Sequence, residues 1–373
     1  MDIISIRHFL HSIAEKSGSE TNSAAFISEQ LRKLGINKIK EHIGGNSLLA
    51  EAGDGKGKKT VLFRCDMDAV EANEDENKPY CSKNKNTAHL CGHDGHSAIM
   101  LYFAYLLQQK PIKDKNILLL FQAEEETGQG AKKVIESGIL DGYSIDAAFA
   151  MHNIPQFEEG VVITNNSCFS CAVRSLWISF AGRVSHASEP ELSVSPFDMM
   201  LAMKKEIESM ENRDFQSDNF FQTTLIEFSL GEKAYGVTAA NGILRFTFRT
   251  KTNALLEEKT RKITQIIKNN IAKNPPIKCD YDFVESFAAN ENDIASVQTI
   301  VSAAKQQDMK TIELKQPFRW GEDFGLFTQK YKGAMFGIGS GLQCSSLHSS
   351  SYDFNDAIIE PSARLFYRIA QTV

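Results

Sequence analysis

The sequence of 373 residues lacks the signals of several protein classes. No uncharged apolar stretch approaches the roughly 18 residues that a membrane-spanning helix needs. The N-terminus has no basic region followed by an apolar core, so we read no signal peptide there. With a net charge of −6 and no basic stripe, we expect neither a nucleic-acid partner nor a membrane partner. The sequence has no Gly-x-Gly-x-x-Gly turn after its first strand, which argues against a dinucleotide-dependent redox enzyme.

The cysteine content also argues against a disulfide framework. Seven cysteines, an odd number in a long chain, fit a reducing compartment better, and we expect a cytoplasmic protein. The hydrophobic content of 42% and the charged content of 24% are typical of globular proteins. The length is sufficient for two domains.

The two ends of the chain show an α/β pattern. Apolar residues at helical spacing predict helices between residues 4 and 35, and the Gly- and Lys-rich residues 53–59 predict a hairpin turn between two short strands. Continuous apolar runs at 116–121 and 147–151 predict strands covered on both faces. Such a sheet binds ligands beyond the carboxyl ends of its strands. We therefore expect an open α/β sheet with a site at that edge.

A different pattern occupies the middle of the chain. Its predicted elements follow the order β-α-β-β-α-β, which is that of a ferredoxin-like α+β domain. We therefore expect a first domain of residues 1–172 and 287–373, interrupted by an inserted domain of residues 173–286. The predicted elements of the insert are strands at 174–181, 225–230, 243–250 and 277–284 and helices at 195–210 and 255–272.

The stretch from His89 to His96 carries the first candidate site residues. A cysteine and a histidine one residue apart, Cys91 and His93, can hold a transition metal ion, and further histidines lie within the same stretch. Gly92 and Gly95 would let the backbone turn tightly enough to direct these side chains inward. The alternative is a buried cysteine beside a surface histidine, and not all of the histidines need be ligands.

Three glutamates, Glu124, Glu125 and Glu126, follow the apolar run that ends at Phe121. Charge runs usually mark a solvated face, which is the alternative here. At the end of a buried strand, however, three carboxylates repel one another unless cations compensate. Successive residues of an extended segment point to opposite sides, so we expect Glu125 and Glu126 to divide the roles of ligand and base.

Other candidates are isolated in the sequence. His152 and His348 follow apolar runs but could equally be core histidines, and Asp66 with Asp68 could orient a ligand histidine or form a turn. Arg249 is a candidate for binding a substrate carboxylate, with a strand-edge salt bridge as the alternative. The Cys168-x-x-Cys171 spacing has no second pair, and we assign it no function.

Taken together, these motifs resemble those of a known family. They are Arg64–Ala69, His89–His96, Phe121–Ala131, His152–Pro155, Ser185–Ala187, Glu322–Phe324 and Leu347–His348 with Tyr352–Asp356. In this order they are similar to the dinuclear zinc amidohydrolases, which include aminoacylases, hippurate hydrolases and auxin-conjugate hydrolases and are related to aminopeptidases and carboxypeptidases. The resemblance covers essentially the whole chain. It departs from the family at Ala123-Glu124, where Pro-Ala is common, and at residues 235–238.

The resemblance implies a zinc-peptidase-like catalytic domain with an inserted lid or dimerisation domain. It implies that Glu125 is the general base, that Asp66 orients a ligand, and that His186 polarises the substrate carbonyl, within a subunit or across a homodimer. The implied cofactor is two divalent metal ions, zinc first, with manganese, cobalt or nickel as alternatives. The implied metal ligands are Cys91, His93, Glu126, His152 and His348.

The implied reaction is cleavage of the amide bond of an N-acyl amino acid or a similar amino-acid conjugate. A di- or tripeptidase of the same family is the alternative within hydrolases. A metal-binding homologue without catalysis is the alternative from another class. The presence of the implied base and of all the implied ligands speaks against it.

Overall fold

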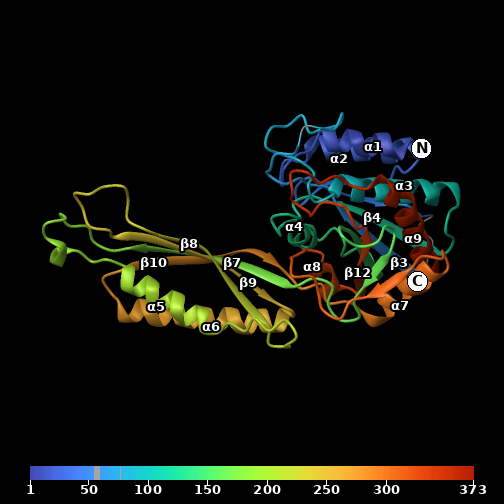
Figure 1. The fold of residues 1–373 in the computed structure, drawn as a ribbon. Helices are drawn as coiled ribbons and strands as arrows, with labels where there is room; N and C mark the ends of the chain where they lie inside the picture. The colour runs from blue at the N-terminus through green and yellow to red at the C-terminus, as the bar shows by residue number, and fades with distance from the viewer. Residues whose placement is uncertain (54–58, 76) are drawn as a thin grey trace. The chain divides into compact units, whose positions relative to one another are not determined.

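The computed structural model describes residues 1–53, 59–75 and 77–373, which form two compact units (Figure 1). The first unit consists of Met1–Phe169, Asn290–Pro317 and Glu322–Val373, and the second of Ser170–Ala289 and Phe318–Gly321. The short Phe318–Gly321 segment thus belongs to the second unit, whereas the predicted division places it in the first domain. Among the described helices, none combines the length and the apolar character that a bilayer span requires.

An open, mixed, eight-stranded sheet forms the centre of the first unit, as predicted. The strands lie in the order β1-β2-β4-β3-β5-β12-β6-β11. In chain order they are β1 (Ile39–Ile43), β2 (Ser47–Glu51), β3 (Lys59–Asp66), β4 (Lys115–Gln122), β5 (Ile145–Ile154), β6 (Val162–Thr164), β11 (Thr311–Glu313) and β12 (Gly333–Gly339).

The four strands β4, β3, β5 and β12 run parallel to one another at the middle of this sheet. The predicted hairpin between β2 and β3 is wrong, because β4 lies between these strands and pairs antiparallel with β2. Most of the turn predicted for it, residues 54–58, lies outside the described residues. Parallel strands bring their carboxyl ends to one edge of a sheet, and candidate site residues lie at that edge.

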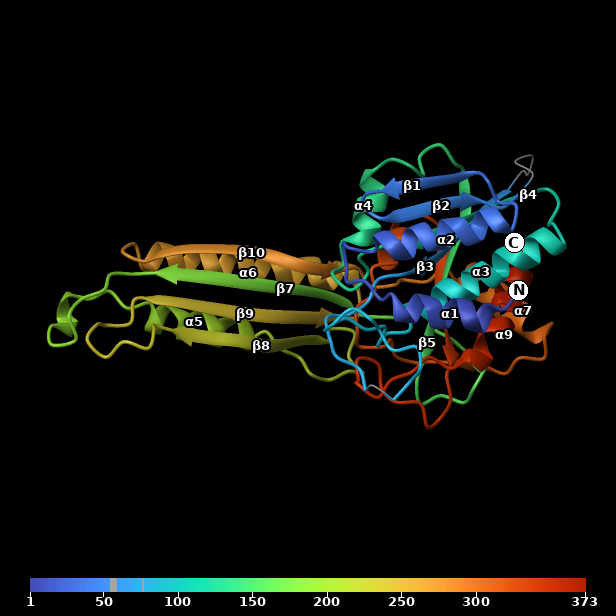
Figure 2. The same ribbon diagram turned by 90° about the horizontal axis from the view of Figure 1, so that it is seen from above.

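Helices cover both faces of the sheet (Figure 2). Val61 and Phe63 of β3, with Ile117 and Leu119 of β4, face the main core. Leu62, which lies between Val61 and Phe63, faces the other side of the sheet, because successive side chains of a strand alternate. Helices packed on the main-core side are α1 (Ile3–Ser12), α2 (Thr21–Lys33), α3 (His93–Gln109), α7 (Ile294–Lys305) and α9 (Ile359–Thr372). The short helices α4 (Gly130–Glu136) and α8 (Gly325–Lys330) pack on each other, on β4 and on β12.

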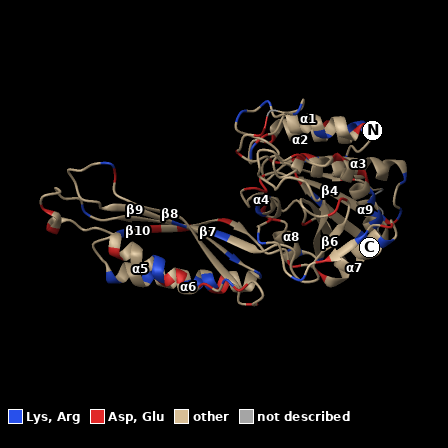
Figure 3. Ribbon diagram, viewed as in Figure 1, with Lys and Arg blue, Asp and Glu red and all other residues tan. Residues whose placement is uncertain are grey.

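The second unit is a four-stranded antiparallel sheet with two helices packed on it, and its β-α-β-β-α-β order confirms the ferredoxin-like prediction. The sheet order is β10-β7-β9-β8. The elements are β7 (Ala172–Ala181), α5 (Phe197–Glu208), β8 (Phe221–Leu230), β9 (Asn241–Thr250), α6 (Asn253–Lys273) and β10 (Lys278–Phe287). Buried apolar residues of α6, among them Leu256, Ile263 and Ile267, recur at helical spacing, and its remaining surface carries charges of both signs (Figure 3).

Candidate metal centre

The site begins at the carboxyl ends of β3, β4 and β5. Asp66 is the last residue of β3 and lies opposite Gln122, the last residue of β4. Glu125 and Glu126 follow in the turn after β4. His152 lies inside β5, near its end, and not directly after the strand as predicted. The strands β3, β4 and β5 thus place polar residues at the same edge of the sheet.

The Cys91-Gly92-His93 segment reaches the same edge because α3 starts there. Gly92 precedes α3 with a φ of 95°, and a Cβ on it would lie 2.7 Å from Asn153 Oδ1 and from the Tyr352 hydroxyl. Only glycine fits at this position. Gly95 has a different role from the predicted one. It lies within α3, and the Phe354 ring packs where its side chain would be.

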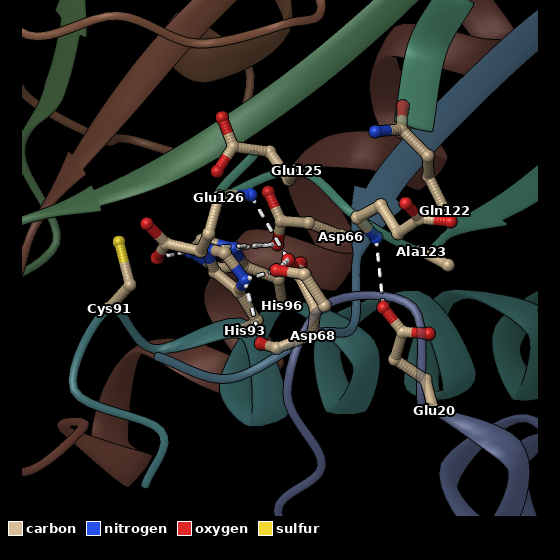
Figure 4. A network of polar contacts seen from close by, with 12 residues as sticks. Glu20, Asp66, Asp68, Cys91, His93, His96, Gln122, Ala123, Glu125 and Glu126 are labelled. Carbon is tan, nitrogen blue, oxygen red and sulfur yellow. Dashed lines mark hydrogen bonds and ion pairs between the residues drawn. The ribbon is translucent and has the colours of Figure 1, made fainter. Parts of the chain in front are cut away.

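The five predicted ligands lie in one cluster, and Figure 4 shows three of them, Cys91, His93 and Glu126. The Cys91 thiol lies 3.5 Å from His152 Nε2, and Glu126 Oε1 lies 3.8 Å from His93 Nε2. His348 joins from the far end of the chain, with its Nε2 3.5 Å from Glu126 Oε1 and its backbone N–H donating to the Leu90 carbonyl at 2.8 Å. These residues form two overlapping groups, Cys91–His93–His152 and Cys91–Glu126–His348, that share the thiol.

The cluster has the properties of a metal site. His93 Nε2 and Glu126 Oε1 are buried and have no hydrogen-bond partner among the described residues, although unpaired buried polar atoms are costly. Burial lowers the pKa of His93, but Asp66, Asp68 and Glu126 outweigh burial and raise it to about 10. The surrounding charges therefore favour a cation at this place. Sulfur, nitrogen and oxygen donors around one space suit zinc and neighbouring transition metals.

Asp68, named with Asp66 as a residue that could orient a ligand histidine, holds the His93 ring. Its Oδ1 lies 3.2 Å from His93 Nδ1 and its carbonyl oxygen 2.9 Å, so Nδ1 carries the proton and Nε2 faces the cluster. The second carboxylate oxygen accepts from the Ser17 hydroxyl at 2.6 Å and from the Glu126 backbone N–H at 3.0 Å. The Asp-Met-Asp spacing after a strand was the available signal for it.

Asp66 makes different contacts. It lies 2.6 Å from His96 Nδ1 and 2.8 Å from Arg64 Nη1, and only 3.8 Å separates it from His93 Nε2. Burial raises its pKa, but His93, His96 and Arg64 outweigh burial and hold the pKa well below its usual value. His96 Nε2 is engaged by Asn153 at 2.5 Å, so both of its ring nitrogens already have partners.

The three glutamates after β4 do not all share the same partners. Glu124 points to Lys133, 2.6 Å from its ammonium group, which accounts for the third carboxylate. Residues 125–128 form a turn, so the premise of an extended segment was wrong, and both Glu125 and Glu126 lie beside His93. Burial, followed by the carboxylates of Glu322, Glu126 and Asp323, raises the pKa of Glu125 well above its usual value.

A pocket of about 440 Å³ adjoins the cluster within the first unit. Glu126 and His348 form part of its wall, and the ion pair between Lys16 and Glu71, 2.8 Å long, is at its exposed side. The full lining is Lys16, Ser17, Ala69, Val70, Glu71, Glu126, Thr127 and His348. The pocket has room for a small molecule next to the candidate ligands.

His186 and Arg249 belong to the second unit. The Ser188 backbone N–H donates to His186 Nδ1 at 3.2 Å, which leaves Nε2 as the protonated nitrogen of an exposed ring. Arg249 is on β9, which lies between β7 and β8, and it makes no ion pair with any acidic group in the described ranges. The edge-strand salt bridge is therefore wrong. Cys168 and Cys171 are buried, and none of the seven cysteines, all of them described, forms a disulfide.

Comparisons with known proteins agree with this arrangement. The sequence pattern of "Peptidase family M20/M25/M40" matches residues 62–372. Hippurate hydrolase of Campylobacter jejuni is 27% identical over 98% of this chain and 94% of its own. N-acetyldiaminopimelate deacetylase of Exiguobacterium sibiricum is 25% identical over 95% of each chain.

Solved structures share the fold of the whole chain. A putative aminohydrolase from methicillin-resistant Staphylococcus aureus superposes with a TM-score of 0.86 at 22% identity, covering 100% of this chain and 96% of the other. A dinuclear metal-binding peptidase of the M20 family from Bacillus subtilis has a TM-score of 0.81 at 22% identity, covering 100% and 98%. The protein is therefore a member of peptidase family M20/M25/M40 and a metal-dependent hydrolase.

Proposed function

We propose that the protein hydrolyses the amide bond of N-acyl amino acids or similar amino-acid conjugates. The observation that carries the proposal is the cluster in which two buried atoms, His93 Nε2 and Glu126 Oε1, lack partners in the described part of the chain, next to a second carboxylate, Glu125. The names of two relatives, a hippurate hydrolase and an N-acetyldiaminopimelate deacetylase, support this substrate class. Cleavage of di- or tripeptides with a free amine is the second candidate.

In this proposal Cys91, His93, Glu126, His152 and His348 would hold two divalent ions. Burial and the carboxylates of Glu126 and Glu125 raise the pKa of the Cys91 thiol, so the thiolate needs a bound cation to form. Two bound divalent ions supply Lewis acidity and make a water molecule more acidic. Zinc is our first candidate, with manganese, cobalt or nickel as alternatives.

Glu125 takes the proton of the attacking water and passes it to the departing amine. Its carboxylate is buried, and its pKa is raised by that burial and by neighbouring carboxylates, as general catalysis near neutral pH requires. It makes one long contact, 3.4 Å from the Asp323 backbone N–H, and so remains available to a substrate. Asp66 and Asp68 hold the histidines around it.

The second unit contributes substrate contacts in this proposal. The Nε2–H of His186 donates to the carbonyl oxygen as negative charge develops there, an effect worth about 3 kcal/mol for one donor. Arg249 binds the free carboxylate of the amino acid. Support for this comes from two more cations around Phe215, whose ring lies 5.2 Å from Lys251 Nζ and 4.4 Å from Arg319 Cζ. Arg249 Nε donates to the Arg319 carbonyl, 3.0 Å away.

We further propose that the inserted domain acts as a lid and as a homodimer interface. Strand β8 is at the edge of its sheet and exposes Ile226, so it can pair with a second copy. Light scattering of the purified protein, with Ile226→Lys as the comparison, measures the oligomer directly. A monomer at all concentrations contradicts the dimer.

The division between base and ligand is tested with neighbouring substitutions. Glu125→Gln should retain bound metal and lose turnover by a factor of about 10² to 10⁴, because a general base contributes that much. Glu126→Ala should instead lower the metal content. Metal analysis and turnover of the same preparations are compared. Equal metal loss in both variants would reverse or void the assignment.

A substrate panel distinguishes the two candidate reactions. The wild-type enzyme, loaded with zinc or manganese, is assayed with N-acetyl and N-benzoyl amino acids and with dipeptides that have a free amine. Preference for the acylated compounds supports amidohydrolase activity, and preference for the peptides supports an exopeptidase. Bound metal with no turnover of any amide favours a non-catalytic homologue.

A further inference from the structure

Arg64, on β3, is at the centre of a buried ionic cluster behind Glu125. It is 1% exposed, and its guanidinium contacts three carboxylates, those of Asp66 at 2.8 Å, Asp323 at 2.7 Å and Glu322 at 3.0 Å. Its Nε donates to the Gln122 side-chain oxygen at 3.0 Å. One side chain therefore connects the end of β3, the end of β4 and the residues at 322–323.

The same cluster lies against Glu125. The carboxylates of Glu125, Glu322 and Asp323 lie within 4.8 Å of one another, and the Asp323 backbone N–H faces Glu125 Oε1. Asp323 also fixes both ends of the turn that carries Glu125. It accepts from the Gln122 amide at 2.8 Å and from the Ala131 backbone N–H at 2.8 Å. The turn is thereby attached at residues 122 and 131 to a carboxylate that Arg64 holds.

We propose that Arg64 is a positioning residue that sets the place of Glu125 by holding Glu322 and Asp323 against the turn after β4. The inference rests on the proposed function, in which Glu125 moves the proton. Arg64 does not touch the substrate. It supplies the positive charge that keeps the buried carboxylates together, and its planar fork reaches all of them at once.

Lysine cannot replace this arrangement. An ammonium group is a single point charge on a flexible stem, whereas the guanidinium presents five N–H donors in fixed directions. In Arg64→Lys the cluster keeps its charge but loses contacts to at least one of Gln122, Glu322 and Asp323. The turn then shifts, and Glu125 with it, while the ligands His93 and Glu126 keep their own contacts to Asp68.

The experiment compares Arg64→Lys with Arg7→Lys in the metal-loaded enzyme. Arg7 is a matched control, because it is also fully buried and contacts three carboxylates, those of Asp94, Asp353 and Asp356. Arg64→Lys should lower kcat about 10- to 100-fold, with KM and metal content unchanged, since small displacements of a reacting group cost this much. Arg7→Lys should leave kcat close to wild type. An unchanged kcat in Arg64→Lys overturns the inference.

A double-mutant cycle separates positioning from general damage. In a Glu125→Asp background, where the carboxylate is already displaced, Arg64→Lys should add little further loss of kcat. Losses that multiply would overturn the inference. If Arg64→Lys does not fold, Gln122→Met tests the same clamp by removing two bonds to Asp323 without a charge change. Full turnover in Glu125→Gln, by contrast, contradicts the proposed function itself.

Discussion

At the scale of single residues, Gly95 shows how closely the metal-site helix is packed. A Cβ at this position would lie 2.3 Å from the Phe354 ring, so Gly95→Ala forces the ring or the helix to move. Alanine is the better helix former by about 1 kcal/mol, but overpacking of a core costs about 1–3 kcal/mol. We expect a net loss of stability, measured as a lower urea midpoint with an unchanged m-value.

Gly142→Ala is the control for this prediction. A Cβ on Gly142 would meet no atom within 4 Å, and this glycine has no positive φ. Its midpoint should stay near that of the wild type. A Gly95→Ala protein as stable as the wild type would contradict the close contact with Phe354.

The sequence indicated candidate ligands, a candidate base and the orienting residues Asp66 and Asp68, but not all of the residues that surround them. The expected ligands and base were named through the family resemblance, because the residue pattern alone left open which histidines and which glutamate take these roles. Arg64 and Gln122 are part of the same site but look like ordinary strand residues. Arg64 meets Glu322 across 258 positions, and no local spacing indicates such a pair. Where Glu125 and Glu126 point also depended on a turn that the pattern did not reveal.

At the scale of elements, α1 is joined to the start of α3 by buried charges. His11 Nδ1 lies 2.8 Å from Asp94 and its Nε2 lies 2.9 Å from Glu74, and Arg7 also contacts Asp94. Burial lowers the pKa of His11, but Asp94 and Glu74 outweigh burial and raise it from 6.5 to about 9. A protonated His11 therefore stabilises the packing of the two helices.

This network predicts a pH dependence of stability. Because the folded pKa of His11 exceeds the unfolded value, its contribution is fully present below pH 6.5 and is lost as the pH rises through about 9. The contribution is of order 3 kcal/mol. The difference in unfolding free energy between wild type and His11→Asn, measured by urea denaturation of metal-free protein, should shrink from pH 6 to pH 10. A difference that is constant with pH would contradict the raised pKa.

The length of an element decided whether the sequence revealed it. The continuous apolar runs of β4 and β5 and the periodic pattern of α6 were predicted, and the structure has them. The three-residue strands β6 and β11 were missed, because three residues are too few to show a period of two. The hairpin between β2 and β3 was wrong because β2 pairs with β1, which precedes it, and with β4, which comes more than sixty residues later.

At the scale of the whole molecule, all five proposed metal ligands belong to the first unit. The chain leaves this unit at Phe169 and returns at Asn290, and the Phe169 backbone N–H donates to the Asn290 carbonyl at 2.8 Å. A short Gly/Ser linker can therefore replace Ser170–Ala289 without stretching the first unit.

We expect the shortened protein to bind metal with the stoichiometry of the full chain but to lose amide hydrolysis, because His186 and Arg249 are removed with the insert. Metal analysis and turnover are measured on both proteins, and circular dichroism verifies that the shortened one is folded. Hydrolysis at the wild-type rate would contradict the proposed roles of His186 and Arg249. Loss of metal from a folded protein would contradict the ligand set.

The antiparallel pairing of β7 with β10, in which Val173 lies opposite Phe287, also affects how the chain folds. Bringing the ends of a flexible loop of about 120 residues together costs about 4 kcal/mol of entropy. If the insert folds first, the contacts within its own sheet offset this entropy, and its two ends then lie side by side. The segments before residue 170 and after residue 289 then search for each other as if a short loop joined them, which would speed the pairing of β12 with β5.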